Sequence, residues 1–134
     1  VERTKYQSWI VEVIEDTVYA FNQEFNKRWN TERKGILYPK SLFEDQGQSS
    51  EYGLKSVLKD IWKDAVSVCG IEMHRRCLSL AHNADFESIE DISLRVTLEA
   101  RNLLMGRELI LNSDSIESVG ELSSIAVKFN EKAV

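Results

Sequence analysis

The sequence predicts an all-α fold, and three observations lead to that prediction. Apolar residues recur every three or four positions over most of the 134-residue chain, which is the spacing of one face of an α-helix. The chain has six glycines and one proline, so few residues would interrupt long helices. No segment alternates apolar and polar residues as a half-buried strand does. We therefore expect residues 1–134 to form a single helical domain, arranged as a bundle.

The first helix is predicted to run from Thr4 to about Asn30. Its apolar face is rich in aromatic side chains and consists of Tyr6, Trp9, Ile10, Val13, Ile14, Thr17, Phe21, Phe25 and Trp29. An aromatic stripe of this kind is typical of a helix that packs into a core. We therefore expect Trp9 and Phe21 to be buried.

The connection after this helix contains Gly35 and Pro39, which are unfavourable in helix interiors. It also contains apolar residues, among them Leu42 and Phe43, so part of it should pack against the domain. Residues 44–51 are largely polar, and loops of this length are often mobile or functional. We expect residues 44–51 to form a mobile loop.

The second helix is predicted from about Glu51 to Val68. Its buried face is expected to consist of Leu54, Val57, Leu58, Ile61, Trp62, Ala65 and Val68. Gly70 should loosen the backbone. We expect a separate helix, from Ile71 to His82, to leave at an angle from that point.

Two further helices are predicted from their start signals. Ser88 followed by Asp91 has the form of a capping box, in which the hydroxyl accepts a free backbone N–H. The helix that begins there should reach about Leu111. Ser118 followed by Glu121 has the same form and should begin a short final helix.

Composition limits the function classes that remain. The formal charge of −5 and the isoelectric point near 5.1 argue against a nucleic-acid-binding protein. No apolar run reaches the roughly 20 residues that span a membrane. Cys69 and Cys77 lie about 12 Å apart along one helix, too far for a disulfide, and two free thiols favour a cytoplasmic location. Neither cysteine has a partner at a metal-ligand spacing, so we expect no metal site.

Residues 68–91 contain the candidate functional residues. Arg75 and Arg76 are adjacent, and on a helix their side chains would lie about 100° apart. Guanidinium groups are planar donors that suit carboxylates, phosphates and paired hydroxyls. Two arginines on a helix can also be a solvated face, or can pair with carboxylates of the chain. The nearby carboxylates that could accept such a pair are Glu72, Asp85 and Glu87.

His82 and Asp85 could act as a base and the residue that orients it. A histidine at a helix end can equally hydrogen-bond a carbonyl group or cap the helix. The neighbouring carboxylates of Glu87, Glu90 and Asp91 have a structural explanation too, because helix starts favour negative charge. Periodicity does not decide between these interpretations.

The amino-acid sequence of residues 68–91 resembles that of a known protein family. The segments that carry the resemblance are Met73-x-Arg75-Arg76 and Ala81-His82-x-x-Asp85. They are similar to a segment of the methylthioribose kinases, sugar kinases with a protein-kinase-like, aminoglycoside-phosphotransferase-like fold. The chain departs from the family pattern at His74, Ser79 and Asn83, where the family tends to have an aliphatic residue, glycine and valine. The resemblance implies a helical bundle from the C-terminal lobe of such a kinase.

The resemblance also implies a function. Arg75 and Arg76 would bind the sugar substrate, 5-methylthioribose, with His82 and Asp85 in supporting positions. ATP and magnesium would be bound by upstream segments of the intact enzyme, and no catalytic residue is expected within these 134 residues. The chain begins VERTKY, which favours a fragment. Its expected partners are therefore the remaining kinase portion and a second copy in a homodimer. The alternative is a non-catalytic helical interaction or regulatory domain.

Overall fold

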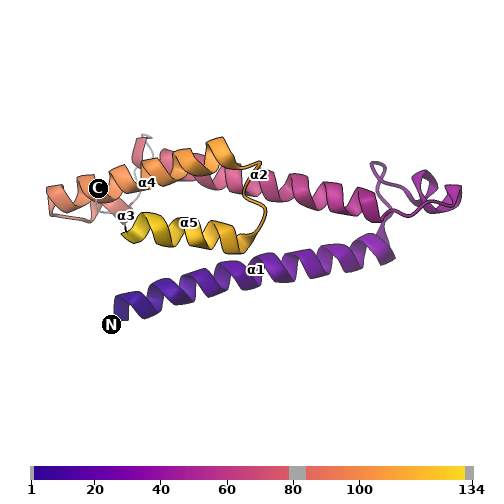
Figure 1. The fold of residues 1–134 in the computed structure, drawn as a ribbon, viewed down its shortest axis with the longest axis horizontal. Helices are drawn as coiled ribbons and strands as arrows, with labels where there is room; N and C mark the ends of the chain where they lie inside the picture. Colours follow the sequence, from indigo (N-terminus) through magenta and orange to yellow (C-terminus); the bar gives the residue numbers. More distant parts are fainter. Residues whose placement is uncertain (1, 79–83, 132–134) are drawn as a thin grey trace. The chain divides into compact units, whose positions relative to one another are not determined.

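The computed structural model describes residues 2–78 and 84–131, and it confirms the all-α prediction. No strand occurs within those two ranges. The elements, in chain order, are α1 (Glu2–Glu32), η1 (Lys40–Leu42), η2 (Glu44–Gln46), α2 (Glu51–Leu78), α3 (Ala84–Glu87), α4 (Ile92–Asn112) and α5 (Val119–Glu131) (Figure 1). None of the helices described is long and apolar enough to cross a membrane.

The chain divides into two compact units, residues 1–61 and residues 62–134. Helix α2 runs without a break across the boundary between them. The first unit contains α1, the two 3₁₀ turns and the start of α2, and the second contains the rest of α2 with α3, α4 and α5. The prediction of a single domain stays a prediction.

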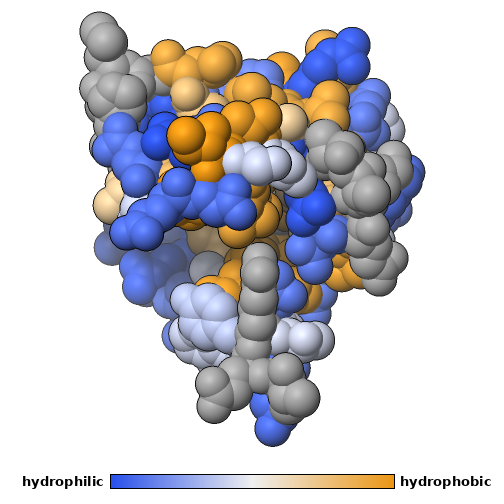
Figure 2. Space-filling model, turned by 90° about the vertical axis from the view of Figure 1, so that its left-hand side faces the viewer, coloured by the Kyte–Doolittle hydropathy of each residue, from blue (hydrophilic) through white to orange (hydrophobic). Residues whose placement is uncertain are grey.

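Helix α1 begins and ends within two residues of its predicted limits, but most of its aromatic stripe is exposed. Trp9 is 52% exposed and Phe21 is 44% exposed, whereas Trp29 is 7% exposed. Trp29 is buried because the connection folds back onto the C-terminal end of α1, where the ring of Tyr38 lies 5.3 Å from the ring of Trp29. The prediction of burial is therefore wrong for Trp9 and Phe21. Figure 2 shows apolar residues at the surface, among hydrophilic ones.

The connection between α1 and α2 contains two successive 3₁₀ turns, η1 and η2. Gly47 ends η2 with a φ of 69°, in the left-handed region that glycine adopts without a steric penalty. A Cβ atom on Gly53 would lie 3.1 Å from the ring of Phe43, so this glycine lets the connection pack closely on the start of α2. Ser50 is buried beside Trp29 and accepts its indole N–H at 3.2 Å. The predicted mobility of residues 44–51 stays a prediction.

Helix α2 continues through Gly70, so the predicted break and the separate helix from Ile71 are wrong. Gly70 is buried where α2 meets α4, and a Cβ atom added to it would lie 2.5 Å from the carbonyl oxygen of Gly106. The glycine is therefore suited to a close approach of two backbones rather than to a bend. The predicted buried face is also shifted in this part of α2. Val66 is buried there, and Ala65 and Val68 are exposed.

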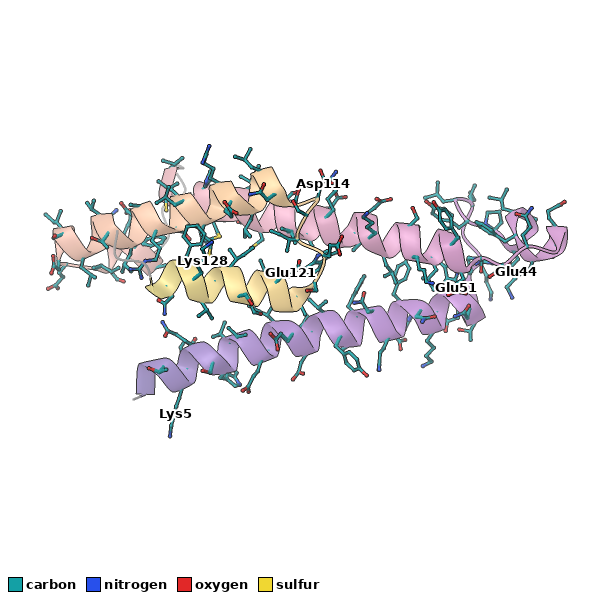
Figure 3. All side chains as sticks on the ribbon, viewed as in Figure 1. Lys5, Glu44, Glu51, Asp114, Glu121 and Lys128 are labelled. Atoms are coloured by element: carbon teal, nitrogen blue, oxygen red, sulfur yellow. The ribbon has the colours of Figure 1, made fainter. Side chains whose placement is uncertain are left out.

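The core of the second unit is small. Its buried members are Val66, Leu109 and Ile116, which are 1%, 0% and 4% exposed. The partly buried residues packed around them are Trp62, Met73, Met105, Leu122 and Ile125. The indole N–H of Trp62 donates to the carbonyl oxygen of Ile116 at 2.7 Å, which ties α2 to the segment between α4 and α5. Asp114, in that segment, pairs with Lys63 of α2 at 2.6 Å (Figure 3).

The start of α4 differs from the prediction. Asp91, not Ser88, is the N-cap residue, and its carboxylate accepts the backbone N–H groups of Ser93 and Leu94. The backbone N–H of Ser88 instead donates to Ala84, because residues 84–87 form the short helix α3. The sequence prediction assigns the N-cap to Ser88 and a supporting position to Asp91, whereas an aspartate carboxylate can itself cap a helix.

The predicted end of α4 and start of α5 are confirmed. Helix α4 ends at Asn112, one residue after the predicted position. The hydroxyl of Ser118 accepts the backbone N–H of Glu121 at 3.3 Å. The carboxylate of Glu121 reaches back and accepts the backbone N–H of Glu117 at 2.7 Å (Figure 3). This is a reciprocal arrangement of the capping-box type.

Candidate functional site

The candidate site lies at the C-terminal end of α2, entirely within the second unit. Two of its neighbouring residues, His74 and Cys77, contact α4, while Arg75 and Arg76 are exposed. This division follows from helix geometry, since residues three apart share a face and the two residues between them point elsewhere. Ser79, His82 and Asn83 lie outside the described residues.

Polar side chains attach this end of α2 to α4. His74 Nε2 lies 2.9 Å from the carbonyl oxygen of Leu103, to which it can only donate, so its proton is on Nε2. The Asn102 side-chain amide donates to the carbonyl oxygen of Met73 at 2.6 Å and to the Cys77 sulfur at 3.1 Å. Two of these bonds join a side chain of one helix to a backbone carbonyl group of the other, so they hold the helical turn that carries the two arginines.

Close backbone approach accompanies these bonds. A Cβ atom on Gly106 would lie 2.8 Å from the ring of His74 and 2.9 Å from the carbonyl oxygen of Gly70. Both glycines are buried. The helices can therefore pack at this short distance only while both positions lack a side chain.

Arg75 makes a two-pronged ion pair within its own helix. Its Nε donates to both carboxylate oxygens of Glu72, at 3.0 and 2.9 Å, and its Nη2 donates to one of them at 2.8 Å. The hydrogen bond with Arg75 is the main reason that the pKa of Glu72 is lowered, and it also raises the pKa of Arg75. Both groups are therefore charged at neutral pH.

Arg76 pairs outside its own helix, with Asp85 of α3. This contact links α2 to α3. The side chains of Arg75 and Arg76 are 42% and 46% exposed, so each keeps surface that a ligand can reach. Two of the three carboxylates considered as partners, Glu72 and Asp85, are thus those that the arginines bind.

The arrangement can bind an anion or a group with several hydroxyls. One carboxylate oxygen of Asp85 accepts a hydrogen bond from the Arg76 guanidinium. Over residues 2–78 and 84–131, no group of three or more His, Cys, Asp or Glu side chains is placed to hold a metal ion.

Sequence reasoning missed the residues that hold this site in place, namely His74, Asn102, Gly70 and Gly106. His74 was noted only as a departure from the family pattern. Asn102 stands beside the apolar residues Leu103 and Leu104, and a polar residue beside such a run is a signal of a buried hydrogen bond. The two glycines are each a signal of close packing when found in a helix interior.

Comparison with known proteins supplies the family. The chain is 27% identical over 117 residues to the methylthioribose kinase of Escherichia coli O45:K1, and 30% identical over 126 residues to methylthioribose kinase 1 of rice. A segment of 65 residues is 43% identical to the methylthioribose kinase of Yersinia enterocolitica. The chain is a homologue of part of the methylthioribose kinases. The alignments cover 87%, 90% and 48% of this chain, respectively.

This methylthioribose kinase homologue corresponds to only part of its relatives. It spans 28% of the length of the E. coli and rice proteins and 16% of the Yersinia protein, and it corresponds to their C-terminal part. No family model matches the chain, and no solved structure matches it. The all-helical architecture is thus that of a segment from a kinase family.

Proposed function

We propose that this chain forms one wall of the sugar-binding site of a methylthioribose kinase. The observation that carries the proposal is the exposed pair of Arg75 and Arg76 on a turn of α2 that hydrogen bonds and close packing attach to α4. Two adjacent guanidinium groups offer several donors in fixed planes, which suits the hydroxyl groups of a sugar. The relatives are methylthioribose kinases, and the proposed substrate, 5-methylthioribose, is inferred from them.

In the proposed reaction, the anomeric hydroxyl oxygen attacks the γ-phosphorus of ATP and the bond to ADP breaks. The hydroxyl proton passes to a base outside these 134 residues. Arg75 and Arg76 would orient the sugar and balance the negative charge that develops near the acceptor oxygen. The ion pairs with Glu72 and Asp85 would hold the two guanidinium groups in their orientations while no substrate is bound.

The nucleotide and its magnesium ion belong, in this proposal, to other segments of the parent kinase. The described carboxylates nearest the arginines are engaged in ion pairs, and none is grouped as a metal site. We expect the 134-residue chain alone to have no kinase activity, and we place the parent enzyme in the cytoplasm. His82 stays a proposed supporting residue.

The test is steady-state kinetics of the parent kinase. Arg75→Ala should lower kcat by roughly tenfold or more, because the charge and the donors are both lost. Arg76→Lys should lower kcat less, because it keeps the charge and loses only the planar group. Arg28→Ala is the matched control, since Arg28 is an exposed helical arginine paired with Glu24 in the other unit. It should leave kcat and KM unchanged.

The thermal midpoint should change little in all three variants, because exposed ion pairs contribute on the order of 0–1 kcal/mol. Normal phosphorylation of the sugar by both arginine variants would contradict the proposal. Unfolding of the variants would contradict it too, because the pair would then be a structural clamp.

A second candidate is a non-catalytic helical interaction domain. The exposed stripe of α1, including Trp9 and Phe21, is the observation that favours it, because exposed aromatic residues are enriched where proteins associate. This candidate predicts self-association, for example as the homodimer proposed above. Sedimentation of the chain and of Trp9→Ser tests whether the stripe mediates association, since the substitution would weaken association through the stripe.

A further inference from the structure

The end of α1 contains a charged group that is buried among aromatic rings. Arg33 follows α1, and its side chain is only 5% exposed. Its guanidinium carbon lies 4.9 Å from the ring centre of Trp29 and 5.5 Å from that of Phe43. Aromatic faces attract a cation, and the attraction is larger where water is excluded. We call Arg33, Trp29 and Phe43 the arginine cradle.

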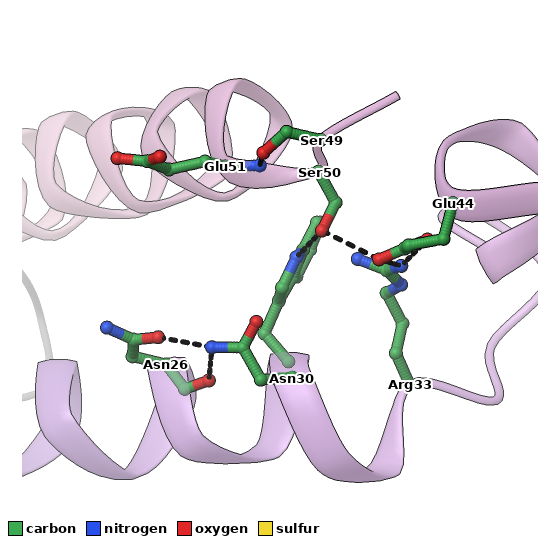
Figure 4. Close-up of polar contacts among 8 residues, drawn as sticks. Asn26, Asn30, Arg33, Glu44, Ser49, Ser50 and Glu51 are labelled. Atoms are coloured by element: carbon green, nitrogen blue, oxygen red, sulfur yellow. Dashed lines mark hydrogen bonds and ion pairs between the residues drawn. The ribbon is translucent and has the colours of Figure 1, made fainter. Parts of the chain in front are cut away.

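A carboxylate of the connection fills this cradle. Both oxygens of Glu44 contact Arg33 Nη2, and one of them accepts the hydroxyl of Ser50 at 2.9 Å. Figure 4 shows Arg33 and Ser50 converging on Glu44 from the two ends of the connection. The same Ser50 hydroxyl accepts the indole N–H of Trp29. One carboxylate therefore links the end of α1 to the start of α2.

The fit between Glu44 and the cradle is incomplete. Arg33 Nε and Nη1 are buried and have no hydrogen-bond partner in the part of the chain that is described. Buried donors without partners are unfavourable, and a guanidinium normally binds a carboxylate through two nitrogens in a parallel pair. Glu44 binds only one nitrogen of Arg33, Nη2, and its backbone is part of η2. An untethered carboxylate would be free to take the two-nitrogen geometry.

We propose that the arginine cradle is a carboxylate-binding site that Glu44 occupies as a tethered ligand, with the connection 34–50 as the strap that delivers it. The inference rests on the cradle alone and is independent of the kinase proposal. Desolvation acts to raise the pKa of Glu44. Hydrogen bonds from its own backbone, Arg33 and Ser50 outweigh that effect, so the pKa is lowered and the group is an anion at neutral pH.

The experiment removes the tethered ligand and supplies a free one. Glu44→Ala should lower the thermal midpoint of the chain by about 5 °C in chloride buffer, because it leaves Arg33 buried without its counter-ion. Sodium formate, the smallest carboxylate, should raise the midpoint again in a saturable manner, beyond any effect of sodium chloride at the same ionic strength. Formate should also shift the Trp29 indole N–H signal in NMR spectra, because that group lies in the cradle.

Two controls isolate the cradle. Arg33→Lys combined with Glu44→Ala keeps the positive charge but lacks the planar group, and formate should not restore it. Glu51→Ala removes an exposed carboxylate that pairs with Lys55 at 2.8 Å, and it should neither lower the midpoint by more than about 1 °C nor respond to formate.

If Glu44→Ala does not fold, Glu44→Ser replaces it, since it also removes the carboxylate and leaves its place in the cradle open. Formate should then shift the Trp29 signal of Glu44→Ser. Equal restoration by chloride, or restoration of the Arg33→Lys double variant, would overturn the proposal. So would the absence of any saturable effect of formate in a folded Glu44 variant.

Discussion

The aromatic stripe on α1 and the contact between α2 and α4 make an instructive comparison. The stripe has large apolar side chains at regular helical spacing, yet Trp9 is 52% exposed. The contact between α2 and α4 relies on small and polar residues, yet it brings the backbones together at Gly70 and Gly106. The region with the stronger hydrophobic pattern is thus the less buried of the two.

This difference shows what a hydrophobic pattern measures. Regular spacing specifies that a helix has an apolar face, and it specifies nothing about what covers that face. Burial requires a second surface, which for Trp29 is the connection folding back and for α2 is α4. Where two helices meet closely, the decisive residues are those that let backbones approach and those that satisfy buried polar groups.

The largest expected effect is a loss of folding stability, and it should differ between the two ends of the aromatic stripe on α1. Trp29→Ala should reduce the free energy of unfolding by about 3–5 kcal/mol, because Trp29 is buried and its indole N–H is bonded to Ser50. Trp9→Ala should cost less than about 1 kcal/mol, because the ring is largely exposed. Urea denaturation of both variants measures the difference. Equal losses would mean that the whole stripe is covered.

The next effect tests the contact between α2 and α4. Gly70→Ala should destabilise the chain by about 1–3 kcal/mol, because the new methyl group would meet the Gly106 carbonyl oxygen at 2.5 Å. Gly120→Ala is the matched control. Gly120 is also helical, and an added Cβ would meet nothing closer than 4.0 Å, so alanine should stabilise α5 by roughly 0.5–1 kcal/mol. A Gly70→Ala variant as stable as the unsubstituted chain would contradict the close approach.

The smallest effect concerns the ion pairs at the exposed end of this contact. Arg75→Ala should raise the pKa of Glu72 towards its usual value, because the hydrogen bond with Arg75 is the main cause of its depression. Arg76→Ala should raise that pKa less, since Arg76 acts on Glu72 only at longer range. NMR titration of the Glu72 side chain measures both shifts. A larger shift in Arg76→Ala would reverse the assigned partners.

The sign of the pH dependence follows from the same pair. A carboxyl group whose pKa is depressed in the folded state contributes stability above its unfolded pKa, which is about 4.3 for glutamate. That contribution should be lost as the pH falls through the lower folded value. Acid unfolding of Arg75→Ala should therefore show a weaker dependence on pH below about 4.5 than the unsubstituted chain.

Short-range signals in the sequence predicted several helix ends of this protein. The limits of α1, the end of α4 and the Ser118 cap of α5 were predictable, because each depends on residues within a turn or two of itself. The sequence around Arg75 and Arg76 was enough to indicate a resemblance to methylthioribose kinases, and the similarity to known relatives confirms that resemblance. The substrate contacts of those arginines stay a prediction.

Only the tertiary structure decided how these helices are used. From the sequence alone, Gly70 is expected to interrupt the helix. In the structure it is a position of close helix packing, because Gly106 lies opposite, 36 residues further along the chain. The partner of His74 is likewise distant, since Leu103 is 29 residues away. Arginine is usually a surface residue, but the connection buries Arg33 between Trp29 and Phe43. Such roles depend on which segments meet in space, and the spacing of residues along one helix contains no information about a surface that another segment provides.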